Sequence, residues 1–325
     1  MILKIVFYTL ASLVILATLI PFIRKDHWTF RVFEFPRLQK LVIVIITIIL
    51  GLPLLHDSVA IRIVLGLLAI SGLYLAYLIF PFTLFASKSV KTVKNPENAV
   101  KILISNVFQD NTRYDKLVQR IERENPDIIL LLETDLKWMH EVADCTKQYP
   151  YKIEYPQDNT YGLLFYSKIE VLEKEVRFLI KKEYPSIKAK LKLPSGAECL
   201  FFGVHPPPPS PTEKTYSTDR DHELWLIAKE VEKIDMPIIV AGDLNDVAWS
   251  FTSDRFLEIS ELLDPRKGRG IYATFHAKIP FLRWPLDHLF CSKHFGLVNM
   301  RRLKGINSDH FPVLIELSVP SSRQR

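Results

Sequence analysis

Uninterrupted runs of apolar residues dominate the first quarter of the chain. Residues 2–23 are almost entirely apolar, with Lys4 as the one charged residue, and residues 41–86 contain only a few polar side chains. A helix needs about 20 apolar residues to cross the hydrocarbon core of a bilayer. The pattern therefore predicts three membrane-spanning helices, at about residues 2–22, 40–56 and 60–86.

Two local features bear on these predicted spans. No small-x-small cleavage motif precedes the basic pair Arg24 and Lys25, so the first segment is typical of a retained anchor and not of a cleaved signal peptide. The second segment is short and contains Gly51 and Pro53, which allow a kink, a tilt or a partly re-entrant path. The number of complete spans decides on which side of the membrane the rest of the chain lies.

A different pattern begins after residue 86. Residues 87–97 are polar and are expected to form a linker, followed by a domain at 98–320 and a tail at 321–325. Short apolar runs predict strands at 100–107, 127–132, 163–166, 187–193, 199–204, 237–241, 286–291 and 312–317. Apolar residues three or four apart predict helices at 114–124, 136–145, 218–233 and 251–259. Mixed strands and helices favour an α/β or α+β sandwich.

Charge around the predicted spans indicates an orientation. Basic residues such as Arg31, Arg37 and Lys88 flank the first and third spans on one side, whereas the connection between the second and third spans carries only Arg62. With three spans, the positive-inside tendency predicts an outer amino terminus and a cytoplasmic domain at the inner or plasma membrane. The net charge of +6 also favours anionic partners, either nucleic acid or lipid headgroups.

Polar side chains stand at the ends of six strand-like segments. They are Asn106, Glu133, His205, the pair Asp243 and Asn245, Asp287, and the pair Asp309 and His310. Any one of them alone is explained by a cap or a turn. Six such ends together indicate a site, because ligand-binding and catalytic groups in layered folds gather where strand ends converge.

The residue types in this set suit one kind of chemistry. Carboxylates with an amide are the hard oxygen donors that Mg²⁺ or Mn²⁺ prefers, and the three cysteines show no CxxC spacing that would indicate a thiolate site. Histidines beside such donors neutralise or protonate a phosphate. Hydrolysis of a phosphodiester needs a cation against the phosphoryl charge, a base for water and donors that hold the anion.

Six segments taken in order resemble the endonuclease/exonuclease/phosphatase superfamily, the metal-dependent hydrolases that include DNase I, abasic-site endonucleases, sphingomyelinases and inositol-polyphosphate phosphatases. The segments are "SNVFQDN", "PDIILLLET", "GVHPPPP", "AGDLND", "WPLDHLF" and "SDHFPVLIEL". The resemblance covers about residues 98–318. It implies a DNase I-like, four-layer α-β-β-α sandwich with the site at one edge of two packed sheets.

The resemblance also implies roles for the matching acids and amides. Glu133 matches the principal Mg²⁺ ligand, Asn106 the amide that supports metal and phosphate, and Asp309 a metal-proximal or orienting acid. Asp243 matches the carboxylate that aligns or deprotonates the attacking water. Asn245 is expected beside it, on the scissile phosphate.

The histidines are expected to act on the phosphate itself. By the same resemblance, His310 contacts it as a base or electrostatic stabiliser, Asp287 holds the His310 ring, and His205 donates to a non-bridging oxygen. Two further residues are candidate substrate contacts from their positions alone. Arg220, at the start of a predicted helix, is within reach of an anion, and Trp249, just after "GDLNDVA", is placed to line a cleft.

Three functions fit these observations. The first is a membrane-anchored, Mg²⁺-dependent phosphodiesterase or nuclease. The second is a lipid-headgroup phosphodiesterase or phosphatase of sphingomyelinase or phosphoinositide type. The third, a non-catalytic membrane scaffold, is disfavoured because a scaffold has no chemical need for the acids, amides and histidines together. The sequence leaves the substrate, endo or exo action, the number of metals and the oligomeric state open.

Overall fold

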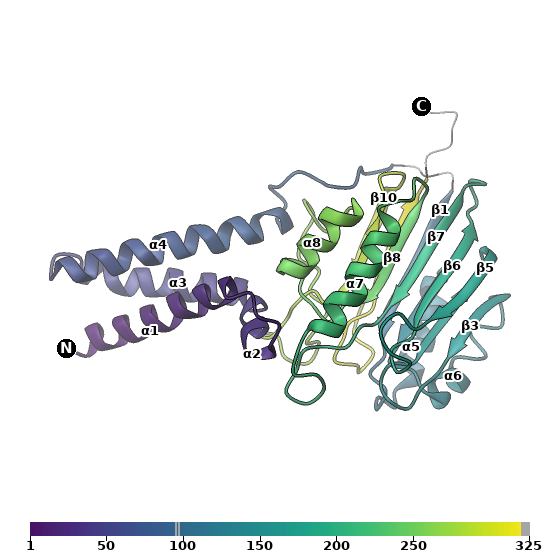
Figure 1. Cartoon of the computed structure of the whole chain (residues 1–325), viewed down its shortest axis with the longest axis horizontal. Helices are drawn as coiled ribbons and strands as arrows, with labels where there is room; N and C mark the ends of the chain where they lie inside the picture. The colour runs from purple at the N-terminus through teal and green to yellow at the C-terminus, as the bar shows by residue number, and fades with distance from the viewer. Residues whose placement is uncertain (95, 97, 320–325) are drawn as a thin grey trace.

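Two β-sheets packed face to face form the part of the chain after residue 98 (Figure 1). The computed structural model describes residues 1–94, 96 and 98–319, so the predicted tail at 321–325 lies outside the described residues. The strands are β1 (Ala99–Asn106), β2 (Ile128–Leu132), β3 (Tyr151–Tyr155), β4 (Leu163–Ser167), β5 (Glu170–Arg177), β6 (Ser186–Lys192), β7 (Glu198–Val204), β8 (Ile238–Asp243), β9 (Asp287–Cys291), β10 (Gly296–Arg302) and β11 (Val313–Ser318). The six-stranded sheet has the order β10-β11-β1-β2-β4-β3, and the five-stranded sheet has the order β5-β6-β7-β8-β9.

Helices cover the outer faces of both sheets. The α-helices of the chain are α1 (Ile2–Leu19), α2 (Trp28–Arg31), α3 (Arg37–Gly51), α4 (Val59–Ile79), α5 (Tyr114–Glu124), α6 (Leu136–Glu141), α7 (Thr218–Val231) and α8 (Phe251–Ser260). Short 3₁₀ turns are η1 (Ile20–Phe22), η2 (Val32–Glu34), η3 (Leu52–Leu54) and η4 (Phe80–Phe82). α5 and α6 cover the six-stranded sheet, and α7 and α8 the five-stranded sheet.

Alternation along the strands builds the four layers. In β1, Ile102 points into the core between the sheets and Leu103 points outward against α5. In β7, Phe201 enters the same central core and Phe202 points outward against α7. Because successive side chains of a strand face opposite ways, a strand with two covered faces is apolar throughout. The four-layer α-β-β-α sandwich expected from the sequence is confirmed.

The strands missed by the sequence pattern all lie at sheet edges. The eight predicted strands and four predicted helices are present, with small shifts at their ends. The three additional strands, β3, β5 and β10, are outermost in their sheets. β5 is largely exposed, with the polar sequence "EVLEKEVR". An edge strand pairs on one side only and carries charge that limits unwanted pairing, so it lacks the apolar run that indicates a buried strand.

The amino-terminal segments form three long apolar helices that project from one side of the sandwich (Figure 1). They extend over Ile2–Phe22, Arg37–Leu54 and Val59–Phe82, and each is long and apolar enough to cross a membrane. The third ends four residues before the predicted boundary at 86 because Pro81 and Phe82 close it as a 3₁₀ turn. Pro53, likewise, lies in a 3₁₀ turn at the end of the second helix.

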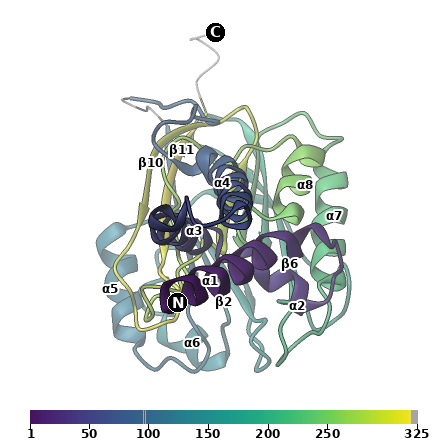
Figure 2. The ribbon, with the colours of Figure 1, turned by 90° about the vertical axis from the view of Figure 1, so that its left-hand side faces the viewer.

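Polar contacts attach these helices to the domain. Arg31 Nη2 lies 3.1 Å from Asp221 Oδ2, and Trp249 Nε1 donates to Glu34 O at 3.0 Å. Further buried charges surround these contacts, and we refer to the whole group, Arg31, Glu34, Arg37, Arg220, Asp221 and Asp246, as the junction cluster. Figure 2 looks onto the face of the domain from which the helices project, with α5 and α6 to one side and α7 and α8 to the other.

Candidate active site

The polar strand ends meet at one end of the two sheets. β1 and β2 are parallel, and so are β7 and β8, while β9 and β11 are antiparallel to their neighbours β8 and β1. The carboxyl ends of β1 and β2 and the start of β11 therefore lie at one end of the six-stranded sheet, and those of β7 and β8 and the start of β9 at one end of the five-stranded sheet. The hydrogen bond from Asn106 Nδ2 to Asp243 Oδ2 joins these two ends. Asn106 ends β1, Glu133 follows β2, Asp243 ends β8, Asp287 begins β9, and His310 precedes β11. The predicted convergence of these residues agrees with the fold.

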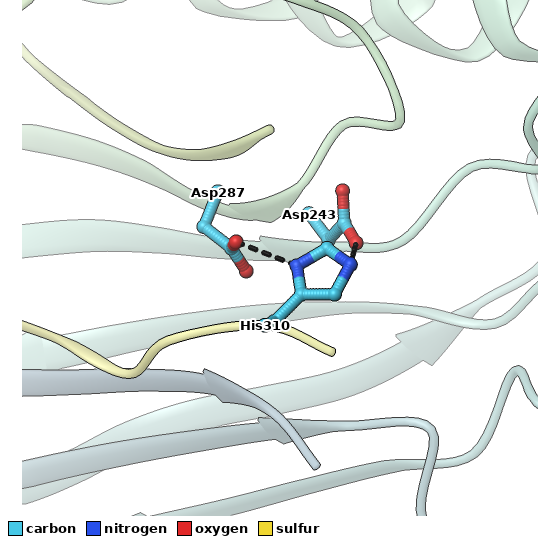
Figure 3. A group of neighbouring side chains, drawn as sticks. All are labelled: Asp243, Asp287 and His310. Carbon is cyan, nitrogen blue, oxygen red and sulfur yellow. Dashed lines mark hydrogen bonds and ion pairs between the residues drawn. The ribbon is translucent and has the colours of Figure 1, made fainter. Parts of the chain in front are cut away.

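An imidazole lies between two carboxylates from neighbouring strands (Figure 3). Asp243 and Asp287 are directly opposite each other in the β8–β9 ladder, where like charges repel. His310 Nδ1 lies 2.8 Å from Asp287 Oδ2, and His310 Nε2 lies 3.5 Å from Asp243 Oδ2. Burial alone would lower the pKa of His310, but the two carboxylates outweigh it and raise the pKa to about 10. A protonated imidazole thus offsets the repulsion between the acids.

The side-chain amide of Asn106 connects acids from the two sheets. Its Nδ2 donates to Glu133 Oε1 at 2.7 Å and to Asp243 Oδ2 at 3.1 Å, while its Oδ1 accepts from Phe108 N at 3.0 Å. Burial raises the pKa of Glu133 to about 7, and the charges of Asp309 and Asp243 act in the same direction. Glu133 therefore lies in an acid-rich environment that a bound cation would stabilise.

The backbone holds Glu133 in an unusual conformation. Its φ of 60° lies in the left-handed region that a residue with a side chain seldom adopts. The next residue is clamped, because Thr134 N donates to Gly162 O at 3.1 Å and Thr134 O accepts from Gln157 N at 3.0 Å. A Cβ at position 162 would lie only 1.8 Å from Thr134 O, so this approach requires glycine. Such local strain is typical of a functional position.

The turn before β11 is tied to both neighbouring segments. Ser308 Oγ donates to Asn106 O at 3.0 Å and accepts from His310 N at 2.9 Å, and Ala277 N donates to Asp309 O at 2.6 Å. Ser308 was not among the predicted site residues, because a serine next to an aspartate is explained by a turn alone. Its contact with the end of β1 depends on the packing of distant segments.

The geometry agrees with a known family. The model of the Endonuclease/Exonuclease/phosphatase family matches residues 105–310, from the residue before Asn106 to His310. The chain belongs to this family. It is therefore a hydrolase of phosphoester bonds. No curated protein matches the chain at a significant level.

Solved structures share the fold of this Endonuclease/Exonuclease/phosphatase domain. TDP2 from D. rerio, complexed with a single-strand DNA product, has a TM-score of 0.56 at 17% identity, and the match covers 68% of this chain and 99% of that one. A mannosyl-6-phosphatase from Bacteroides thetaiotaomicron has a TM-score of 0.56 at 19% identity, covering 67% and 99%. A family protein from Bacteroides vulgatus has a TM-score of 0.55 at 19% identity, covering 69% and 100%. At these identities the likeness shows the fold alone.

The donors of the site fit a divalent cation, on which enzymes of this family depend. Glu133, Asp309 and Asp243 supply oxygen atoms, and burial raises the pKa of Asp243, like that of Glu133, to about 7. Asp243, Asp287 and His310 also bring ligand atoms within 4.8 Å of one another. His310, however, is protonated between its two acids and has no free lone pair for a metal. The carboxylate oxygen atoms of the site, and not His310, are therefore the candidate ligands.

His205 and Asn245 lie beside this cluster. His205 follows β7, is 3% exposed and packs its ring 5.3 Å from that of Tyr161. Burial lowers the pKa of His205 to about 3, and the charge of His310 acts in the same direction, so the imidazole is neutral at pH 7. Asn245 N donates to Asp243 Oδ1 at 2.9 Å, which orients that carboxylate. Both residues lie at the predicted site.

Arg220 occupies a structural position and not the predicted substrate contact. Its side chain is 0% exposed, so it cannot reach an anion in solution. Nη1 donates to Asn245 O at 2.8 Å, and Nη2 lies 2.8 Å from Asp221 Oδ1 and 3.3 Å from Asp246 Oδ2. The sequence placed Arg220 at a helix start, where exposure is usual, and beside Asp221, but it did not indicate the contacts with Asn245 and Asp246 across the fold. Arg220 supports the loop that carries Asn245.

Trp249 also differs from its predicted position. The residue is 2% exposed, and its ring lies 5.9 Å from that of Phe82 at the end of the third apolar helix. Its Nε1 donates to Glu34 O on the other side of the junction. The indole therefore attaches the apolar helices to the domain and does not line a substrate cleft. Its contacts with Phe82 and Glu34 join segments more than 160 residues away, which the local sequence does not reveal.

Proposed function

We propose that the protein is a membrane-anchored, Mg²⁺-dependent hydrolase of a phosphodiester, acting by in-line attack of water. The observation that carries this proposal is an acid-rich cluster, Glu133, Asp243, Asp287 and Asp309, in which His310 is the one cationic side chain among the described residues. The carboxylates outnumber the compensating charge, so the cluster calls for a divalent cation and an anionic substrate together. Mn²⁺ is the alternative metal, since it accepts the same oxygen donors.

The residues divide between metal binding and water activation. Glu133, Asn106 and Asp309 hold the cation, which when bound would offset negative charge on the phosphoryl oxygens. Asp243 orients the attacking water and takes its proton. Its pKa of about 7, raised by burial, suits a base that works near neutral pH. Asn245, adjacent to Asp243, contacts the scissile phosphate.

The imidazoles stabilise the phosphate during the reaction. The oxygen of water bonds to phosphorus as Asp243 takes its proton, the bond from phosphorus to the leaving oxygen breaks, and the leaving alkoxide takes up a proton from solvent. His310, held by Asp287, places positive charge against the phosphoryl oxygens. His205 is neutral and donates one N–H to a non-bridging oxygen.

The apolar helices serve as the anchor in this proposal. Three helices of spanning length, with the connection at residues 23–36 on the domain side, keep the site close to a bilayer. The basic residues around Arg24, Lys25 and Lys88 place the domain in the cytoplasm by the positive-inside tendency. Protease accessibility in intact cells tests this orientation. Cleavage of the domain from outside the cell would contradict it.

Substrate assays on the full-length chain test the proposed activity. With Mg²⁺ present, we expect hydrolysis of bis(p-nitrophenyl) phosphate, and a panel of plasmid DNA, abasic DNA, sphingomyelin and phosphoinositides identifies the preferred class. The similar structures support a phosphoester substrate, since one carries a DNA product and another is named for a phosphosugar. Absence of turnover throughout the panel, together with absence of Mg²⁺ binding, would contradict the proposal.

A further inference from the structure

A short hairpin connects the site with the apolar helices. Thr274 N and Phe275 N both donate to Trp284 O at 3.0 Å, and His276 N donates to Leu282 O at 2.7 Å. A turn closes the hairpin, with Leu282 N donating to Ile279 O at 3.1 Å. We call residues 274–284 the site hairpin. Backbone hydrogen bonds between residues 274–276 and 282–284 thus fix the position of the turn between them.

The tip of the site hairpin is apolar and exposed. Ile279 is 41% exposed, Phe281 84% and Leu282 43%, and Pro280 completes the turn. Turns in contact with water are normally built from polar residues and glycine. Lys278 and Arg283 flank the tip. An apolar tip between two cations matches the composition of a segment that inserts among lipid headgroups, with its charges in the anionic layer.

The hairpin reaches the level of the membrane-spanning helices. Gln39 Nε2, in the first turn of α3, donates to Phe281 O at 2.9 Å. Leu38, in the same turn, is 41% exposed, and Phe85, just beyond the third helix, is 90% exposed. Phe281 is therefore next to the domain-side end of a helix that crosses the bilayer. A membrane containing that helix would meet the tip at its headgroup layer.

The other end of the hairpin forms part of the active site. The Phe275 ring lies 5.0 Å from the His310 ring, and Ala277 N donates to Asp309 O at 2.6 Å. Lys278 Nζ lies 5.5 Å from the ring of Phe108, two residues after Asn106. One short element thus has its base against catalytic groups and its tip at the bilayer level. Substrate held in the headgroup layer is adjacent to both.

We propose that the tip of the site hairpin, Ile279 to Leu282, is a membrane-contact surface, and that the site takes the phosphoester of a lipid headgroup in the same bilayer. The lipid substrate in this inference rests on the proposed function, phosphodiester hydrolysis. The membrane-contact surface rests on the geometry of the site hairpin alone. The hairpin inserts its apolar side chains between lipids, while Lys278 and Arg283 attract the anionic headgroups.

Depth-dependent quenching tests the surface directly. The full-length chain is reconstituted in phosphatidylcholine and phosphatidylglycerol vesicles with an environment-sensitive fluorophore on Phe281→Cys. The matched control is Leu172→Cys, which is 40% exposed on β5, on the side of the domain away from the helices (Figure 1). The three native cysteines are buried and do not compete for the label. We expect doxyl lipids to quench the fluorophore at position 281 and not at position 172. Equal quenching at both positions would overturn the proposal that the tip of the site hairpin contacts the membrane.

Paired substrates test the lipid preference. The rate on a p-nitrophenyl phosphodiester with a hexadecyl chain, carried in the vesicles, is compared with the rate on soluble bis(p-nitrophenyl) phosphate. Phe281→Asp is expected to lower the first rate about tenfold and leave the second unchanged, because it removes the burial of one aromatic side chain. Leu172→Asp should change neither rate. Equal losses on both substrates, or preferred cleavage of plasmid DNA by the wild-type chain, would overturn the lipid assignment.

The outcomes separate this inference from the proposed function. Hydrolysis of the soluble diester without quenching at position 281 overturns the membrane-contact surface and leaves the proposed chemistry standing. Quenching at position 281 without hydrolysis of either diester overturns the proposed chemistry and the substrate assignment, while the surface remains.

Discussion

Two acids three residues apart in the chain, Asp243 and Asp246, belong to two different clusters of charged side chains. Asp243 faces the active site, where it contacts Asn106 and His310. Asp246 faces the junction cluster, where Arg220 lies 3.3 Å away and Ser250 Oγ donates at 2.7 Å. The end of β8 and the loop after it thus contribute one acid to each cluster. Both acids are 1% exposed, so burial does not distinguish them.

The balance of charge distinguishes them. The junction cluster contains the acids Glu34, Asp221 and Asp246 and an equal number of arginines, with Arg220 bound to both aspartates. The active site has the acids Glu133, Asp243, Asp287 and Asp309 against His310. Buried charges in balanced pairs are satisfied within the protein, whereas an excess of buried acid requires a ligand. The cluster of several acids with a single imidazole, and not burial, is what distinguishes the candidate active site from the junction cluster.

Removal of Glu133 is expected to have the largest effect. Glu133→Gln retains the shape of the side chain but loses the charge that binds the cation, so kcat/KM should fall about a thousandfold. Hydrolysis of bis(p-nitrophenyl) phosphate measures the loss. Thermal unfolding should stay cooperative, because the substitution removes a carboxylate from an acid-rich environment.

His310→Ala should give a comparable loss of hydrolysis, and Ser308→Ala a smaller one, because Ser308 only positions its neighbours: its hydroxyl contacts the backbone of Asn106 and His310 and, at 3.3 Å, the carboxylate of Asp309. Retained activity in both Glu133→Gln and His310→Ala would refute the assignment of the site.

Substitution of Arg220 tests whether the junction cluster depends on its balance of acids and arginines. Arg220→Met leaves Asp246 buried without its cation and should lower the free energy of unfolding by about 3–5 kcal/mol. Thermal unfolding of the chain in detergent micelles measures this change. The double variant Arg220→Met/Asp246→Asn should recover part of the stability, because it removes the uncompensated charge as well. A fall in hydrolysis with unchanged unfolding would instead favour the substrate contact that the sequence suggested.

Glu223 supplies a third case, a single buried acid. It is 1% exposed on α7, and among the described residues neither of its carboxylate oxygens has a hydrogen-bond partner. Burial raises its pKa from 4.5 to about 8. Between these values the unfolded chain is ionised while the folded chain retains the proton. The stability from this group is therefore fully present below pH 4.5 and is lost as pH rises through about 8.

Glu223→Gln should flatten this dependence. The wild-type free energy of unfolding is expected to fall by up to about 1.4 kcal/mol per pH unit within the window because of this group. Unfolding curves at several pH values compare the two chains, and Glu232→Gln, at an exposed position nearby on the chain, is the control. Parallel curves for wild type and Glu223→Gln would show that Glu223 does not cause the decline.

Local pattern predicted most of the fold, and strand ends predicted most of the site. The strands buried on both faces were visible as apolar runs, and the acids and histidines after them converge because the strands do. Edge strands such as β5 were missed because an exposed ladder has no apolar run. Arg220 and Trp249 were misplaced because their partners lie in distant segments, and Ser308 was missed for the same reason. Contacts between segments far apart in the chain determine where these three side chains lie, and a local sequence pattern does not show such contacts.

Chelation tests the central claim, that the acid-rich end of the two sheets hydrolyses a phosphodiester with a divalent cation. The full-length chain in detergent micelles is assayed on bis(p-nitrophenyl) phosphate after treatment with EDTA, and again after Mg²⁺ or Mn²⁺ is restored. We expect hydrolysis to be lost on chelation and to return with either cation in the wild-type chain, but not in Glu133→Gln. Turnover that is unaffected by EDTA, or that returns equally in Glu133→Gln, would contradict the claim.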